Sequence, residues 1–128
     1  MLNSGLFTSA RGDWRTPKAL YDALDAEFHF DFDPCPANPT FDGLSMAWGE
    51  RNYVNPPYGR KIGAWIEKGY REWLGGGKLV VFLVPSRTDT AWWHEWLMRA
   101  SEIRFLRGRV HFDERGPAPF PSAVVVFR

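Results

Sequence analysis

The chain has 128 residues, of which 45% are hydrophobic and 24% are charged, and its formal net charge is +1. Such a chain is one domain that buries about two thirds of its unfolded surface, too short for a separate recognition domain. No apolar run reaches the roughly 18 residues of a membrane span, and the first residues lack a signal-peptide pattern. The single cysteine excludes an internal disulfide. The three histidines are scattered without the spacing of metal ligands, so we expect no metal site. We expect a cytoplasmic protein without a membrane partner.

The charges are distributed unevenly along the chain. Residues 13–50 contain eight acids against two bases, whereas residues 51–128 contain seven acids against thirteen bases. The acidic part suits a cationic ligand, and the basic part suits a phosphate backbone. Alternatively, many of these charges lie on solvated helix faces.

The first half of the chain predicts a helix followed by a strand. Residues 1–12 are expected to form a flexible lead-in, and residues 13–128 the single domain. Thr16-Pro17 is typical of a helix start, with a hydroxyl at the cap and proline in the first turn. Apolar residues at helical spacing follow, and the alternation of phenylalanines with polar residues over 28–33 predicts a strand that ends at Pro34.

The second half predicts four more strands and two helices. A short strand at Tyr53-Val54 precedes an apolar helical stripe from Ile62 to Leu74, which the glycines at 75–77 stop. The apolar run 79–84 is typical of a central parallel strand buried on both faces.

A third helix is expected near Asp89, with Trp92, Trp93, Trp96 and Leu97 facing the core. Strands near 103–106 and 123–127 should pair antiparallel across the loop at 113–121. Together these elements predict a compact, doubly wound α/β fold, a minimal Rossmann-like domain whose mostly parallel sheet of about five strands ends in an antiparallel hairpin. Ligands bind such sheets beyond the carboxyl ends of the strands.

Asn55-Pro56-Pro57-Tyr58 is the most informative motif of the chain. The exocyclic amine of adenine is a poor nucleophile, so a catalyst must accept both of its N–H hydrogens. The amide oxygen of Asn55 and the carbonyl of Pro56 are two such acceptors, and the prolines stiffen the loop that holds them. Tyr58 offers an aromatic face to a base lifted from its stack. Alternatively, the motif is only a turn that ends a strand.

Several further motifs accompany this tetrapeptide in a fixed order. They are Trp14-Arg15-Thr16-Pro17, Phe32-Asp33-Pro34-Cys35-Pro36, Asp42-Gly43-Leu44 before Trp48, Asn55-Pro56-Pro57-Tyr58-Gly59-Arg60, Leu83-Val84-Pro85-Ser86-Arg87-Thr88-Asp89-Thr90, Arg107-Gly108-Arg109 and Pro119-Phe120-Pro121-Ser122. In order and spacing, the chain resembles the phage-type DNA N6-adenine methyltransferases, or phage Dam family, from about Trp14 to Phe127. The resemblance implies S-adenosylmethionine as methyl donor, adenine in DNA as acceptor, and a phage or prophage protein in a bacterial host.

The resemblance also implies donor-binding residues. The Thr16-Pro17 edge borders the methionine pocket in the family pattern, although Thr16 could simply cap its helix. The segment Asp33, Pro34 and Cys35 corresponds to the motif that contacts the donor, but the Gly-x-Gly turn that usually follows is missing here. Asp33 could instead cap its loop, and Asp42 could supply the ribose-binding acid from another loop.

Five arginines are candidate DNA contacts. They are Arg60, Arg87, Arg104, Arg107 and Arg109. Arginines at strand ends also commonly cover a sheet edge, and this alternative stays open for the last three.

The sequence therefore predicts direct methyl transfer, without metal, to the N6 amine of a flipped adenine in DNA. One alternative is a methyltransferase acting on another planar nitrogen, in RNA or on a protein glutamine. A second is a degenerate, non-catalytic nucleic-acid-binding module, suggested by the missing glycine-rich turn. DNA is the expected partner, and a homodimer is one assembly that the sequence allows.

Overall fold

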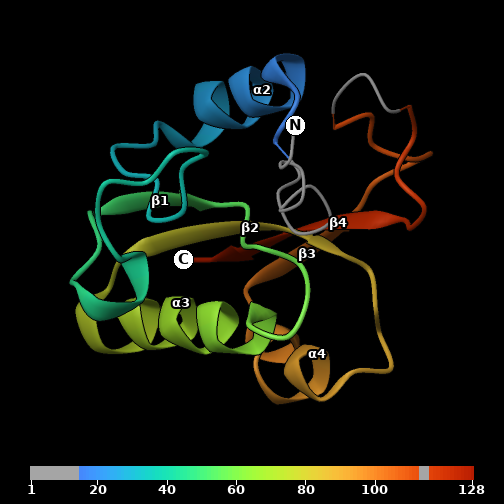
Figure 1. The fold of residues 1–128 in the computed structure, drawn as a ribbon. Coiled ribbons are helices and arrows are strands. Elements are labelled where there is room, and N and C mark those ends of the chain that lie inside the picture. Colours follow the sequence, from blue (N-terminus) through green and yellow to red (C-terminus); the bar gives the residue numbers. More distant parts are fainter. Residues whose placement is uncertain (1–14, 113–115) are drawn as a thin grey trace.

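A computed structural model describes residues 15–112 and 116–128 of the chain. The expected lead-in at residues 1–12, Trp14, and residues 113–115 of the predicted loop lie outside this part. A four-stranded sheet of order β1-β2-β4-β3 forms the centre of an α/β fold, with α2 on one face and α3 and α4 on the other (Figure 1). The strands are β1 (Arg51–Val54), β2 (Leu79–Pro85), β3 (Glu102–Phe105) and β4 (Ser122–Phe127). The helices are α2 (Lys18–Phe28), α3 (Ile62–Gly76) and α4 (Ala91–Glu95), with 3-10 turns η1 (Gly43–Ser45) and η2 (Leu97–Arg99).

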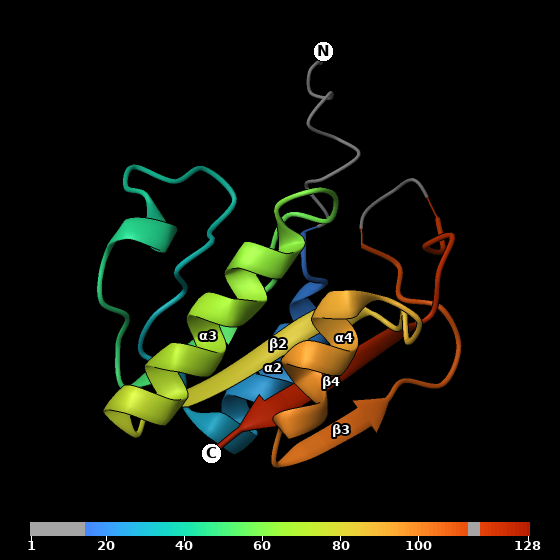
Figure 2. The ribbon, with the colours of Figure 1, turned by 90° about the horizontal axis from the view of Figure 1, so that it is seen from below.

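Strand β2 is the centre of the core, and each of its residues is buried. Successive side chains of a strand point to opposite faces, so this uniformly apolar strand serves two hydrophobic layers. Val80, Phe82 and Val84 pack with α3 and α4. The alternate residues Leu79, Val81 and Leu83 pack with α2 on the other face. Figure 2 shows α3 and α4 lying across the first of these faces. The prediction of a strand buried on both faces is therefore confirmed.

The sheet is less parallel than the sequence predicts. Among the four strands of the described residues, β1 and β2 pair in parallel, while β4 pairs antiparallel with both β2 and β3. The last two strands do form the predicted antiparallel pair. β4 lies between β2 and β3, so β3 is the edge strand on that side of the sheet. The expectation of a mostly parallel sheet of about five strands is not confirmed.

The predicted strand over residues 28–33 is wrong. Helix α2 continues to Phe28, His29 takes the left-handed conformation (φ 55°) that ends it, and the strand shrinks to one parallel bridge between Phe32 and Asn52. Phe28 and Phe30 belong to one aromatic cluster, in which Phe30 also packs on Tyr53, whereas Phe32 stacks on Phe41. Packing of aromatic rings and a β-strand produce the same period-two pattern here.

The predicted helices differ from the observed ones at their ends. The third helix begins at Ala91, close to the expected start near Asp89, and the hydroxyl of Thr90 caps it by accepting from the N–H of Trp93. Of the aromatic residues expected inside, Trp93 is buried, while Trp92 is only partly buried. Leu74 is 60% exposed, so the apolar stripe of α3 ends before it.

Gly69 gives a test of how tightly α3 packs on β2. A Cβ at this buried position would lie 2.4 Å from Cζ of Phe82, which is itself fully buried. Overpacking costs about 1–3 kcal/mol, against a gain of about 1 kcal/mol in helix propensity. We expect Gly69→Ala to lower the unfolding free energy measured by urea denaturation.

Gly75→Ala is the matched control, because Gly75 lies in the same helix with open space around a built Cβ. It should leave stability unchanged or raise it by up to about 1 kcal/mol. Equal stabilisation by both substitutions would contradict the close contact between α3 and β2.

Candidate active site at one edge of the sheet

The topology brings several motifs of the sequence to a single edge of the sheet. Strands β1 and β2 are parallel, and β4 runs opposite to β2 with Ser122 opposite Pro85. Segments that follow β1 and β2 therefore meet the segment that precedes β4. The segments at this edge are residues 33–35, 55–59, 86–87, 106–109 and 119–121.

The loop after β1 contains the predicted catalytic tetrapeptide. Pro56 is buried and Pro57 partly buried, so the two fixed φ angles lie in a packed environment. Tyr58 donates a hydrogen bond to the carbonyl of Leu83 at 3.1 Å, and its ring makes an edge contact with Phe120 at 5.5 Å. Burial raises the pKa of Tyr58 well above its ordinary value, so the hydroxyl stays protonated. The ring is thus held from β2 and from the segment before β4.

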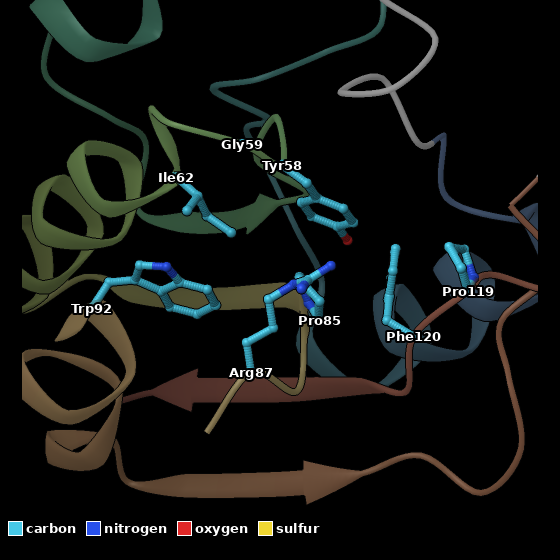
Figure 3. Close-up of a pocket in the computed structure, with 8 residues that line it drawn as sticks. All are labelled: Tyr58, Gly59, Ile62, Pro85, Arg87, Trp92, Pro119 and Phe120. Carbon is cyan, nitrogen blue, oxygen red and sulfur yellow. The ribbon is translucent and has the colours of Figure 1, made fainter. Parts of the chain in front are cut away.

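A cavity of about 440 Å³ opens beside Tyr58. It is lined by Tyr58, Gly59, Ile62, Pro85, Arg87, Trp92, Pro119 and Phe120. Figure 3 shows the guanidinium group of Arg87 between the side chains of Trp92 and Phe120, below the ring of Tyr58. Its Cζ lies 5.6 Å from the centroid of the Phe120 ring. The cavity therefore combines aromatic walls with one cation.

Thr16 does not cap α2, contrary to the simpler interpretation of its position. The N-cap is Pro17, and no side chain bonds the first turn of the helix. The hydroxyl of Thr16 instead bonds the hydroxyl of Tyr53 and accepts from Nδ2 of Asn55 at 3.2 Å. The segment before α2 is thereby joined to β1 and to the catalytic loop.

Asp33 caps its own loop, as one of the two sequence-based interpretations expected. Its Oδ1 accepts from the backbone N–H of Cys35 at 2.9 Å. Burial raises the pKa of Asp33, and the bond from Cys35 only partly opposes that shift. Burial raises the pKa of Tyr53, and the negative charge of Asp33 adds to that rise, which indicates that the carboxylate lies near the hydroxyl of Tyr53. A partly buried anion of this kind would be stabilised by a cationic ligand.

The loop with Asp42 packs directly against the Asp33 segment. Asp42 is exposed, and its side chain caps η1 by accepting from the N–H of Leu44 at 3.0 Å. A Cβ on Gly43 would lie 2.0 Å from the carbonyl oxygen of Pro34, so only glycine allows this approach. The indole of Trp48 donates to the carbonyl of Gly43 at 2.7 Å, which explains why a tryptophan follows this motif.

The candidate DNA contacts fall into two groups. Arg104 makes a double hydrogen bond to Glu27, at 2.6 and 2.7 Å, and another to Glu102 at 2.6 Å. It therefore joins β3 to α2. Arg60, Arg87, Arg107 and Arg109 are exposed. Of these, Arg109 donates to the carbonyl of Ala118 at 3.2 Å.

Residues 3–121 match the family model of DNA N-6-adenine-methyltransferase (Dam). The chain belongs to this family. Its members are enzymes that methylate the N6 amine of adenine in DNA and use S-adenosylmethionine as methyl donor. Membership confirms the resemblance and selects an enzyme over a non-catalytic binding module. No curated protein matches this Dam-family chain.

The sequence did not predict several of the residues that line the cavity beside Tyr58. Trp92 was assigned to the core and Phe120 only to a motif, because no local pattern says that an aromatic side chain faces a cavity. The buried hydroxyls of Ser86 and Ser122 lack hydrogen-bond partners in the described part of the chain. Their placement depends on the pairing of β2 with β4, which local sequence does not encode.

Within residues 15–112 and 116–128, no three His, Cys, Asp or Glu side chains lie together as candidate metal ligands. None of the helices in these ranges combines the length and apolar character of a membrane span.

The raised pKa of Asp33 predicts how stability depends on pH. Its pKa is higher in the folded state than in the unfolded state, so the folded protein loses stability as pH rises from the ordinary carboxyl pKa, about 3.9, through the raised value. Asp33→Asn keeps an acceptor for the N–H of Cys35 but removes the charge. We expect the ligand-free variant to melt at a higher temperature than the wild type at pH 7, and its melting temperature to lack this part of the pH dependence. A variant less stable at pH 7 would contradict the burial of an ionised Asp33.

Proposed function

We propose that this enzyme methylates an adenine that rotates out of DNA into the cavity beside Asn55-Pro56-Pro57-Tyr58. The observation that supports this proposal is the place of Asn55 directly after β1. On one side of β1, Phe32 bridges to Asn52 and leads into the acidic segment of Asp33, and on the other side lies β2, which ends at Pro85 in the wall of the cavity. A donor and an acceptor bound on these two sides would meet at Asn55.

The catalytic loop supplies the polarity that an adenine amine needs. The N6 lone pair is delocalised into the ring, so methyl transfer requires the nitrogen to move towards tetrahedral geometry. Oδ1 of Asn55 and the carbonyl of Pro56 each accept one N–H and stabilise the positive charge that develops. Because Pro56 and Pro57 restrict the loop, these acceptors need little reorganisation during the reaction.

The cavity fits a planar base in size and composition. Its volume of about 440 Å³ lies within the range of roughly 300–1,000 Å³ that is typical of ligand pockets. Tyr58, Trp92 and Phe120 provide aromatic surface for stacking, as in other proteins that hold extruded bases. Arg87 at this cavity supplies a positive charge for the adjoining phosphate.

The segment 33–35 and Thr16-Pro17 would hold the donor, with Asp42 nearby. S-adenosylmethionine supplies an electrophilic methyl group on a cationic sulfonium centre. The residues fit such a group, because the partly buried carboxylate of Asp33 is an anion whose charged form gains from a nearby cation. Thr16 lies within hydrogen-bond distance of Asn55, which joins the donor side to the catalytic loop.

A methyl-transfer assay with labelled S-adenosylmethionine tests this function. Plasmid DNA, a structured RNA and a protein mixture serve as parallel acceptors. We expect label on N6 of adenine in DNA, located by sequencing of modified adenines. Label confined to RNA or to a protein glutamine would reject DNA as the substrate.

Asn55→Ala should abolish transfer but leave donor binding intact. The substitution removes an acceptor for the target amine, and loss of one such group lowers kcat by about 10²–10³-fold. Single-turnover rates and calorimetry with S-adenosylmethionine measure the two effects separately. Asn38→Ala, at an exposed asparagine of another loop, is the control and should behave as the wild type. Near-normal turnover of Asn55→Ala would reject the mechanism.

Arg87→Ala should weaken DNA binding about equally across sequences and reduce the salt slope by about one, because a phosphate contact carries no base information. Fluorescence anisotropy at several salt concentrations measures both quantities. Arg104→Ala is the matched control, since Arg104 is engaged by Glu27 and Glu102. It should lower the melting temperature without changing the salt slope. If Arg104→Ala reduced the salt slope and Arg87→Ala lowered only the melting temperature, Arg104 would be the phosphate contact and Arg87 the structural residue.

A further inference from the structure

Tyr53 is a buried tyrosine whose hydroxyl lies next to the catalytic loop. The side chain is only 2% exposed, and its ring contacts Tyr21 at 5.1 Å and Phe30 at 5.3 Å between centroids. Packing alone would be satisfied by phenylalanine. The hydroxyl, which burial would otherwise penalise, forms a hydrogen bond with the hydroxyl of Thr16.

Thr16 extends this contact to the catalytic asparagine. The same Oγ1 atom that bonds Tyr53 accepts a hydrogen bond from Nδ2 of Asn55 at 3.2 Å. The three side chains come from three different segments, namely the residue before the N-cap of α2, strand β1, and the loop after β1. They form a polar chain that runs from the core to the site.

The direction of the Asn55 amide decides what it can do. Only Oδ1 can accept a hydrogen from an amine, whereas Nδ2 would present its own hydrogens to it. The bond to Thr16 holds Nδ2 on the Thr16 side and so directs Oδ1 away from Thr16. If the hydroxyl of Thr16 could turn freely, it could donate its hydrogen to Oδ1 of Asn55 instead. The Asn55 amide could then adopt the reversed orientation, with Oδ1 towards Thr16 and Nδ2 towards the acceptor amine.

We propose that Tyr53 is a positioning residue, which holds the Thr16 hydroxyl and through it the amide orientation in which Asn55 presents Oδ1 to the acceptor amine. This inference rests on the role of Asn55 given under the proposed function. Because Tyr53 is buried, it acts on the rate of transfer without touching the donor or the base. Its loss should therefore change kcat and leave the affinity for both ligands unchanged.

Tyr53→Phe removes the hydroxyl and keeps the ring. We expect its single-turnover rate to fall about tenfold, while the dissociation constants for S-adenosylmethionine and for a DNA duplex stay at wild-type values. Tyr21→Phe is the matched control, because it removes a hydroxyl from the same aromatic cluster. It should methylate DNA at the wild-type rate.

Variants of Thr16 test the middle of the chain. Thr16→Val keeps the shape but loses Oγ1. At saturating S-adenosylmethionine, which offsets any loss of donor contact, it should be as slow as Tyr53→Phe, whereas Thr16→Ser should restore most of the rate. The double variant Tyr53→Phe with Thr16→Val should be no slower than either single variant, since both remove the same restraint. Should Tyr53→Phe fail to fold, the contrast between Thr16→Val and Thr16→Ser decides the question.

The outcomes separate this inference from the function on which it rests. Wild-type turnover by Tyr53→Phe, or equal rates for the valine and serine variants of Thr16, would overturn the positioning role if Asn55→Ala is inactive. Activity in Asn55→Ala would instead overturn the role of Asn55 itself. Equal slowing by Tyr53→Phe and Tyr21→Phe would indicate a general effect of the aromatic cluster and would also reject the positioning role.

Discussion

The site depends on the pairing of β2 with a parallel neighbour on one side and an antiparallel neighbour on the other. The parallel pairing puts the end of β1 beside the end of β2, and the antiparallel pairing brings the start of β4 to the same place. Because every residue of β2 is buried, a slip of one residue in its register would exchange its side chains between the two hydrophobic layers and disrupt the packing of both. The same hydrophobic burial that stabilises the fold therefore fixes the relative positions of the catalytic loop and the cavity.

Close packing on one side of the sheet determines where the acidic loops lie. The carbonyl of Pro34 approaches Gly43 so closely that no side chain fits between them, and Trp48 bonds the carbonyl of the same glycine. Burial alone would raise the pKa of Glu72, but hydrogen bonds from Lys68, Lys78 and the backbone of Trp48 lower it to about 2. This carboxylate of α3 thus holds the loop before β1 by a charged hydrogen bond at ordinary pH.

The sequence predicted elements whose cause is local, and missed features whose cause lies far along the chain. The apolar run of β2 and the glycines after α3 act on their immediate neighbours, so their roles could be predicted. Thr16 has the local pattern of a helix cap, yet its partners lie 37 and 39 residues away. Arg104 has the pattern of a phosphate contact, but its carboxylate partner Glu27 is 77 residues earlier. The left-handed turn at His29, where the sequence predicts a strand, was missed because a left-handed residue other than glycine carries little signal.

The direction of β4 has a consequence for joining this enzyme to other proteins. The strand starts at the site edge and ends, with Phe127, at the opposite edge of the sheet. A six-residue strand spans about 20 Å, so a domain fused after Arg128 would begin about that far from the cavity. A sequence-reading module attached there would leave the mouth of the cavity open. Its linker would have to reach around the sheet before the module and the catalytic loop could engage the same duplex.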